Sequence, residues 1–396
     1  MKKNVNKSYN NNKLRRKLKK IITRKKYGDW AIILEDVFQR RAYEFELTDE
    51  EIIAEARNFV QNVNEICWVS ENELDSSSTV GIYFSGDNGR ICLNQDYFLN
   101  EYRYAQSNID FGQMLYEVLT HEIYHAISDW YKLDDTMGLV FYDMIKGYYR
   151  GIAINEVFTE VAADRTSYSK NVADAEKGRR DTVGYPTITF SINLLAAALG
   201  WSEKELLKAG IQGREELSKF LNSKFSEKIF ADVVGKGYLA SFENALDAIY
   251  DVEYNSDEYV DSNEGFEASK KRVKEALKGL YKTAYEIMNF RIEVSNDDID
   301  LNHVEELKYS LSKMERIVRD SFRNFNKSYN YSRKEQYEIM NSLNYIKSRV
   351  ESQINGMNII AKSCEVIDDQ DLVKQVTNEG RGLISVCVSL RIKNKR

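Results

Sequence analysis

Two histidines and a glutamate stand at a spacing that suits metal chemistry. The segment His121-Glu122-Ile123-Tyr124-His125 places its imidazoles at positions i and i+4, which lie on one face of a helix about 6 Å apart along its axis. Both imidazoles can therefore reach a single zinc ion, with Glu122 beside it as a base. The chain has only three histidines, so random placement would yield this motif about one or two times in a thousand.

A third ligand is expected from a carboxylate elsewhere in the chain, because a catalytic zinc has three protein ligands and a water. The remaining histidine, His303, lies far away in an apolar stripe. Glu156, Glu160 and Asp164 follow one another at i, i+4 and i+8 in an otherwise apolar segment, where acids must be paired or bound to a metal. We expect one of them to be the ligand and another to accept a histidine N–H, which fixes the imidazole tautomer.

The segment after the histidine motif resembles that of the gluzincin class of zinc metallopeptidases. Asn155-Glu156-x-Phe158-Thr159 begins 30 positions after the second histidine and is similar to the Asn-Glu-Gly-Phe-Ala/Thr segment of aminopeptidase-N-like enzymes, although Val157 replaces the glycine. The resemblance covers roughly residues 75–200. It implies a zincin-like fold, Zn²⁺ as the cofactor and Glu156 as the third ligand.

Two further local resemblances concern the acids of the same helix. Glu156 and Glu160 resemble the Glu-x-x-x-Glu of the anthrax lethal factor catalytic domain and the Pro-Pro endopeptidases, in which a tyrosine seven positions before the ligand polarises the scissile carbonyl. That role falls here on Tyr149, with Tyr185 as the alternative. In contrast, Glu160-x-x-Ala-Asp164 resembles the Glu-x-x-Ala-Asp of membrane-bound CAAX-type peptidases, which would move the ligand to Glu160 and its partner to Asp164.

Sequence periodicity predicts the elements that position these groups. Apolar residues at helical spacing, with capping signals, predict helices over about 49–66, 111–130, 152–167 and 188–199. The β-prone runs around Gly86-Asp87-Asn88-Gly89 predict a hairpin over 79–93. Its edge would allow an extended peptide to add as a further strand.

The fold class expected from the whole chain is α+β and mostly α. Only one proline, Pro186, occurs in 396 residues, which favours helices. Two apolar stripes, Val304 to Val318 and Tyr337 to Met357, predict an antiparallel helical bundle with a helix at about 266–289. We expect three parts, namely a basic, flexible arm at 1–30, a zincin-like metallopeptidase domain at 31–255 and a helical bundle at 256–396.

Charge and composition bound the partners and the location. Residues 1–30 hold twelve Lys or Arg and one acid, so this arm could make weak contacts with nucleic acid or an anionic surface. The four cysteines are widely spaced and indicate no disulfide scaffold. No signal peptide or transmembrane segment is expected, and cytoplasmic is the default location.

The sequence therefore predicts a hydrolase, a zinc metalloprotease that cuts peptide or protein substrates internally. Zinc would lower the pKa of a bound water to about 7, so that Glu122 can take its proton. Tyr149 would donate to the oxyanion. The alternative is a binding or regulatory protein that keeps the metallopeptidase fold without turnover and uses the basic arm and helical bundle to engage a partner.

Overall fold

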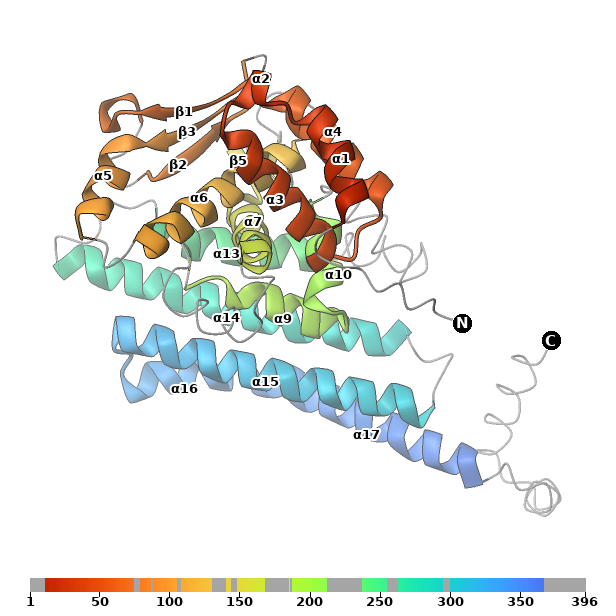
Figure 1. Cartoon of the computed structure of the whole chain (residues 1–396). Coiled ribbons are helices and arrows are strands. Elements are labelled where there is room, and N and C mark those ends of the chain that lie inside the picture. The colour runs from red at the N-terminus through yellow and green to blue at the C-terminus, as the bar shows by residue number, and fades with distance from the viewer. Residues whose placement is uncertain are drawn as a thin grey trace, which may run out of the picture. The chain divides into compact units, whose positions relative to one another are not determined.

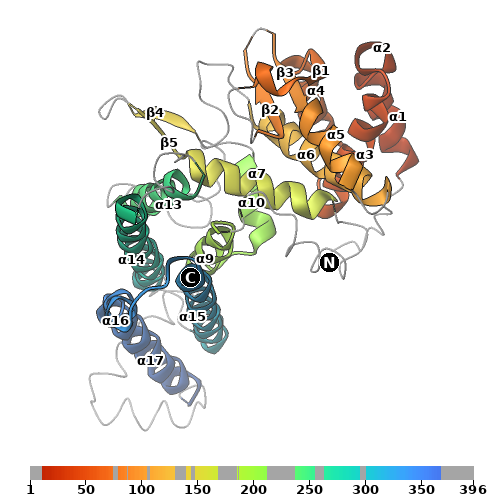
Figure 2. The same cartoon turned by 90° about the vertical axis from the view of Figure 1, so that its left-hand side faces the viewer.

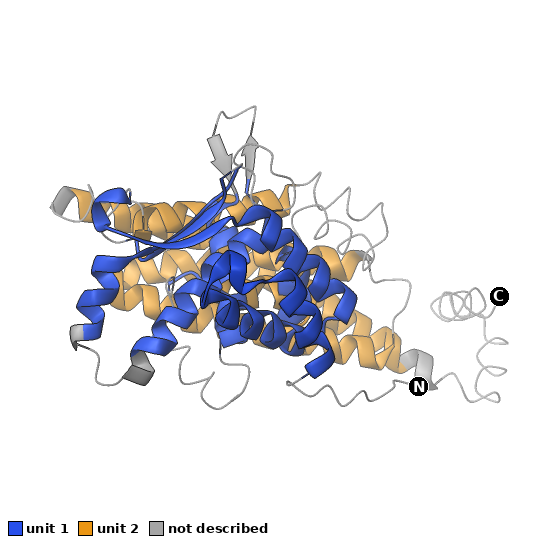
Figure 3. Ribbon diagram, turned by 45° about the horizontal axis from the view of Figure 1, so that its top comes forward, with its two compact units in different colours: residues 1–189, 203–224 blue, residues 190–202, 225–396 orange. Residues whose placement is uncertain are grey.

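The computed structural model divides the chain into two compact units (Figure 3). Unit 1 comprises Met1–Thr189 and Glu203–Lys224, and unit 2 comprises Phe190–Ser202 and Phe225–Arg396. The structure describes residues 11–74, 79–86, 88–104, 108–129, 140–143, 148–167, 185, 187–211, 237–254, 263–294 and 300–366. None of the helices in these ranges has the combination of length and hydropathy that a bilayer crossing requires.

Unit 1 begins with four helices that pack on one another (Figure 1). They are α1 (Asn12–Ile21), α2 (Arg24–Tyr27), α3 (Trp30–Glu44) and α4 (Asp49–Asn62). The capping box predicted at the start of α4 is present, because the side chains and backbones of Thr48 and Glu51 bond reciprocally. The predicted helix 49–66 is too long, since the chain after Asn62 turns into a strand.

Residues 11–30 are not the flexible arm that their charge predicted. The side chain of Asn11 caps α1, and α1 packs on α3 and α4 with Leu14 and Leu18 buried. Further along, the hydroxyl of Tyr27 donates to the carbonyl of Val63 at 2.7 Å. The charge pattern alone did not indicate this packing. It depends on the leucines at i and i+4, which fix one side of the helix to α3 and α4.

A three-stranded sheet of order β1-β3-β2 lies over helix α6 (Asn108–Ser128) of the same unit (Figure 1). Its strands are β1 (Glu65–Val69), β2 (Gly81–Phe84) and β3 (Arg90–Asn94), with β1 parallel and β2 antiparallel to β3. The predicted hairpin is confirmed as β2 and β3. Among the described strands β2 pairs with β3 alone; its other edge, which pairs with no described strand, is here called the open edge.

The rest of unit 1 contains three helices that contact α6 and a short two-stranded ribbon. It consists of η1 (Glu71–Glu73), α5 (Gln95–Tyr104), the ribbon β4 (Phe141–Asp143) and β5 (Tyr148–Arg150), α7 (Ile152–Ser167) and α10 (Glu203–Ile211). The ribbon directly precedes α7 (Figure 2). Gly151 joins them with φ 76°, a left-handed conformation that glycine adopts without strain. The helices predicted over 111–130 and 152–167 are confirmed as α6 and α7.

Unit 2 is helical throughout its described residues. Its helices are α9 (Phe190–Leu199), α13 (Tyr238–Tyr254), α14 (Asn263–Val294), α15 (Leu301–Tyr329), α16 (Arg333–Asn341) and α17 (Asn344–Val366). The predicted bundle is therefore present, but the unit also takes in α9, which packs against α14 and α15, and α13, which packs against α14. The domain boundary predicted after residue 255 thus differs from the division in the structure.

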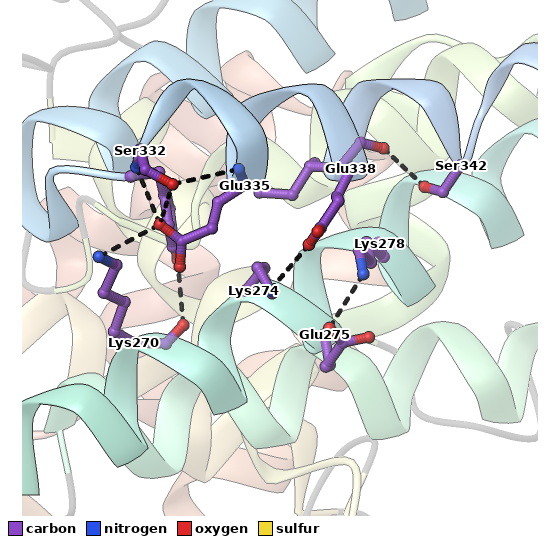
Figure 4. Close-up of polar contacts among 10 residues, drawn as sticks. Lys270, Lys274, Glu275, Lys278, Ser332, Glu335, Glu338 and Ser342 are labelled. Carbon is purple, nitrogen blue, oxygen red and sulfur yellow. Dashed lines mark hydrogen bonds and ion pairs between the residues drawn. The ribbon is translucent and has the colours of Figure 1, made fainter.

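A break between α16 and α17 corrects the second apolar stripe. Leu343, Val350 and Ile354 are buried as predicted, but Tyr337 and Met340 are exposed. The helix stops at Asn341 and restarts at Asn344, so residues before the break do not continue the same face. Polar contacts join α14 to α16 instead, with Lys270 to Glu335 at 3.4 Å and Lys274 to Glu338 at 3.1 Å (Figure 4).

The overall class, mostly helical with a small three-stranded sheet and a two-stranded ribbon, agrees with the prediction of an α+β, mostly α protein. The first apolar stripe is also confirmed, because Val304, Leu307, Met314 and Val318 of α15 are buried. Together these elements place the predicted metal ligands and the predicted base on two packed helices of unit 1.

Candidate metal centre

The two predicted histidines and the three predicted glutamates meet where α6 packs on α7. His121, Glu122 and His125 lie on α6, and Glu156 and Glu160 lie on α7. The two helices are in contact. Helix α7 is buried on most of its circumference, so its apolar residues do not form a single stripe. A helix buried on all sides has no solvent for its acids, so its carboxylates must find partners inside the protein.

Three side chains converge on one point. The Nε2 atoms of His121 and His125 lie 3.0 Å apart. The carboxylate of Glu156 reaches both, with Oε2 3.4 Å from Nε2 of His121 and Oε1 3.5 Å from Nε2 of His125. Ligand atoms of these three residues all lie within 4.8 Å of one another, so the group could hold a metal ion. A carboxylate so close to two imidazoles is stabilised by positive charge, which a protonated imidazole or a bound cation can supply.

Glu160 contacts the far side of the first imidazole. Its Oε2 lies 2.7 Å from Nδ1 of His121, so it accepts the Nδ1–H and leaves the Nε2 lone pair directed at the cluster. Of the two glutamates, the geometry thus brings Glu156 to the ligand position and Glu160 to the supporting one. The alternative with Glu160 as ligand and Asp164 as its partner requires a different arrangement of α7.

The second imidazole has a neighbour to which the sequence analysis gave no role. The side-chain amide of Asn155 lies 3.4 Å from Nδ1 of His125. An imidazole that binds a metal through Nε2 carries its proton on Nδ1, so the amide oxygen is the group that would accept it, after a half-turn of the amide. Asn155 directly precedes Glu156 in the sequence. This adjacency is the sequence feature that could have indicated a position beside the histidines.

Burial and charge act in opposite directions on the ionisable groups. Burial alone would lower the pKa of His121, but its hydrogen bonds to Glu156 and Glu160 raise the pKa well above its usual value. Burial would raise the pKa of Glu156, yet the charge of His125 and the hydrogen bonds from both imidazoles hold the pKa well below its usual range. The cluster therefore favours an ionised Glu156 facing a positive charge.

Glu122 differs from Glu156 because burial dominates its electrostatics. The side chain is 5% exposed, and this burial raises the pKa of its carboxyl group. The backbone N–H of Tyr83 donates to the same carboxyl. A buried carboxyl group beside the histidine cluster, with a pKa raised by burial, is suited to act as a general base.

The edge of β2 packs directly against this base. A Cβ atom on Gly81 would lie 2.8 Å from Cγ1 of Val118 and 3.1 Å from Oε1 of Glu122, so only glycine allows the strand to approach α6 this closely. Val80 pairs with Asn94 of β3 through a hydrogen bond of 2.9 Å. Strand alternation then directs the backbone groups of Gly81 and Tyr83 to the open edge. Sequence analysis missed Gly81.

The two candidate tyrosines are placed differently. Tyr149 lies in β5 opposite Tyr142, and its side chain falls outside the described residues. The ring of Tyr185 is half-buried, with its centroid 6.1 Å from that of the His121 ring. The structure therefore brings Tyr185 next to the cluster, and the role predicted for Tyr149 stays a prediction.

A second network holds the opposite side of α6. The guanidinium of Arg41 on α3 forms two hydrogen bonds to Glu55 on α4, at 2.6 and 2.7 Å, and one to the hydroxyl of Tyr124 at 3.1 Å. That hydroxyl also lies 2.5 Å from Oγ1 of Thr166 on α7. Because Tyr124 directly precedes His125, the network ties the segment with the two histidines to α3, α4 and α7.

Comparison with family models, curated proteins and solved structures gives no match to this chain. The interpretation of the site therefore depends on its own geometry.

Proposed function

We propose that the chain is a zinc-dependent metallo-endopeptidase. The observation that carries the proposal is the convergence of His121, His125 and Glu156 beside the buried carboxyl of Glu122. Two imidazoles and one carboxylate are a usual protein ligand set of a catalytic zinc site, which keeps a further position open. The donor set therefore fits zinc, and the spacing of its members matches that of the gluzincin peptidases that the sequence resembles.

Each residue has a distinct task in peptide-bond hydrolysis. Zinc bound by the three ligands would lower the pKa of a water to about 7 and polarise the scissile carbonyl. Glu122 accepts the proton of that water and returns it to the leaving amine. Glu160 and Asn155 orient the imidazoles of His121 and His125 through their Nδ1 atoms.

The open edge of β2 supports an extended peptide as substrate. Gly81 directs its backbone groups to this edge, next to Glu122. A peptide that adds to the edge as a strand would present its carbonyls beside the base. Extended binding along a strand does not depend on the termini of the peptide, which favours internal cleavage. A substrate complex without main-chain pairing to β2 would contradict this part of the proposal.

The oxyanion that forms during hydrolysis needs a donor in addition to the metal. Tyr149 remains the candidate from the local resemblance, and Tyr185 is the candidate from proximity to His121. The zincin fold is part of the same proposal. It is supported by a small sheet whose antiparallel edge strand lies on the helix with the two histidines.

The test is the metal content of the purified full-length chain, measured by mass spectrometry for the wild type and for Glu156→Gln, Glu160→Gln and Glu305→Gln. We expect about one zinc per chain in the wild type, loss in Glu156→Gln, and retention with about 10- to 100-fold weaker affinity in Glu160→Gln. Glu305 is exposed in unit 2, so its variant is the matched control. Absence of zinc from the wild type even with excess metal would overturn the proposal and favour the binding-protein alternative.

A further inference from the structure

The outer side of α1 and α2 carries positive charge that the proposed active site does not use. Residues 11–28 contain nine Lys or Arg and no acid. Of the 56 basic residues of the chain, 47 thus remain elsewhere, against all 62 acids. The protein is therefore strongly polarised, with a compact cationic region on an acidic remainder.

Three of these nine cations have partners within unit 1. Arg15 lies 3.5 Å from Glu35, Lys17 lies 2.9 Å from Asp49, and Lys26 donates to the carbonyl of Val60 at 2.7 Å. The other six side chains are exposed and form no ion pair with any part of the chain that the structure describes. These six residues, here named the basic face, are Lys13, Arg16, Lys19, Lys20, Arg24 and Lys25.

The basic face is held rigidly toward solvent. Leu14, Leu18 and Ile22 lie on the inner side of the segment and are 4%, 0% and 1% exposed. With its apolar side packed on α3 and α4, α1 cannot roll over to insert into a lipid core. A partner of the basic face must therefore be an anionic surface that accepts cations without penetration by this helix.

Exposed aromatic surface adjoins the α2 end of the basic face. Trp30, which begins α3 just after α2, has its ring 5.7 Å from that of Trp68 in β1. Trp68 is 41% exposed although it also packs edge-on against Phe98 at 5.4 Å. Indole rings next to lysine and arginine are typical of the interfacial zone of membranes.

A bilayer fits these features better than nucleic acid does. Single-stranded nucleic acid requires free aromatic faces on which bases stack, whereas Trp68 already packs against rings on either side. The only aromatic residue in residues 11–28 is Tyr27, which is buried. Asp29 and Glu65 border the aromatic pair as exposed acids, but the region keeps its positive excess.

We propose that the basic face docks unit 1 on the surface of a bilayer that contains anionic phospholipids, with Trp68 at the level of the head groups. Lysine and arginine side chains at such a surface interact with lipid phosphates and carboxylates. The attachment is peripheral and reversible, and it is separate from the proposed hydrolysis, so either can fail without the other.

The test is co-sedimentation of the full-length chain with phosphatidylcholine vesicles, with and without phosphatidylserine. We expect binding only with phosphatidylserine, and weaker binding as salt rises. The variant Lys13→Gln/Arg16→Gln/Lys19→Gln/Lys20→Gln should bind on the order of a hundredfold or more weakly, since each cation contributes about fivefold. The matched control changes four exposed cations of unit 2 and should bind like the wild type; it is Arg316→Gln/Arg319→Gln/Lys327→Gln/Lys334→Gln.

A second measurement separates the bilayer from other polyanions. Lipids brominated in their acyl chains should quench tryptophan fluorescence on binding, and Trp68→Phe should lose most of that quenching while circular dichroism stays unchanged. Equal binding to vesicles without phosphatidylserine, equal loss in both quadruple variants, or tighter binding to duplex DNA than to the anionic vesicles would overturn the proposal. The last outcome would identify a nucleic acid as the partner.

Discussion

Two contacts between helices differ in the residues that form them. One is the contact of α6 with α7 in unit 1, and the other is the contact of α14 with α15 in unit 2. Between α6 and α7, two histidines face two glutamates within hydrogen-bonding range. Between α14 and α15, the hydroxyl of Tyr281 meets Oγ of Ser321 at 2.8 Å, and the surrounding buried residues of α15 are mainly apolar. The first contact joins ionisable groups to one another. The second pairs hydroxyls and holds one buried cation, Arg291 of α14, whose Nη1 donates to Oγ of Ser310 on α15 at 3.1 Å.

The hydroxyl pair of Tyr281 and Ser321 shows what stability alone requires. A buried hydroxyl pair satisfies itself with one hydrogen bond, and apolar neighbours supply the burial. Buried ionisable groups must overcome desolvation, which can exceed their mutual attraction. Unit 2 instead keeps its ion pairs near the surface, as with Lys274 and Glu338 (Figure 4). The buried ionisable cluster of unit 1 is therefore hard to explain as packing and easier to explain as a binding site.

The largest expected effect comes from removing the base while keeping the cluster. In Glu122→Gln we expect zinc content to stay at the wild-type level, because this side chain is not among the three convergent donors. Peptide hydrolysis should fall by about a hundred- to ten-thousandfold. Metal analysis and cleavage of a mixed peptide library would measure both quantities on the same sample.

Glu275→Gln is the matched control in unit 2, where the side chain is 56% exposed and pairs with Lys278 at 2.9 Å. It should leave hydrolysis unchanged. If both variants lost activity equally, the contrast between the two contacts would have no functional meaning.

The second prediction concerns the network behind α6. In Arg41→Met, Glu55 remains buried without its bidentate partner, and Arg41 itself is fully buried. Removal of one member of a buried ion pair costs about 3–5 kcal/mol. We expect the free energy of unfolding to fall by that amount. Urea titration followed by tryptophan fluorescence, to which Trp30 and Trp68 contribute, would measure it.

The double variant Arg41→Met/Glu55→Leu tests the cause of that loss. Since it removes both charges, it should recover much of the stability that the single variant loses. An equal loss in both variants would attribute the effect to packing of the arginine stem. The charges of Arg41 and Glu55 would then contribute little to stability.

The third prediction separates the two candidate oxyanion donors. Loss of one such donor lowers kcat by about a hundred- to a thousandfold. We expect this fall in Tyr185→Phe, whose ring lies beside His121, with KM and zinc content unchanged. Tyr149→Phe is the paired variant, and a fall in that variant alone would restore the assignment made from sequence.

Sequence alone predicted the site better than it predicted the boundaries of the units. The spacing of His121 and His125 follows from helical geometry, and the acids of α7 stand out because they interrupt an apolar segment. Such local patterns can be recognised without knowledge of the fold. They were sufficient to group both histidines and both glutamates in one site, and these residues meet at the α6–α7 contact.

Features that depend on contacts between distant segments were missed. The strand β1 pairs in parallel with β3, which lies 25 positions later, from Glu65 opposite Arg90 to Val69 opposite Asn94. No local pattern specifies such a pairing. The need for glycine at position 81 arises only because β2 approaches Val118 of α6. The place of α9 in unit 2 likewise depends on its contacts with α14 and α15.

The smallest expected effect lies in unit 2 and concerns the cap of α16 (Figure 4). Ser332 and Glu335 form a reciprocal capping box. The backbone N–H and the hydroxyl of Ser332 hold the pKa of the Glu335 carboxyl below its usual value. Since the folded-state pKa is depressed, this stabilisation is present above the usual pKa of a glutamate and is lost as pH falls through the folded value. Ser332→Ala should lower stability at neutral pH by about 1 kcal/mol.

The variant should also flatten the decline of stability in acid, because less of the stabilisation then depends on an ionised Glu335. Thermal unfolding by circular dichroism across a pH series measures both effects, and Ser328→Ala, at an exposed position of the preceding helix, serves as the control. Zinc content and hydrolysis should not change, since the cap contributes no side chain to the α6–α7 cluster. A loss of zinc in Ser332→Ala would mean that the helices of unit 2 support the proposed metal centre, and the two contacts could no longer be treated as independent.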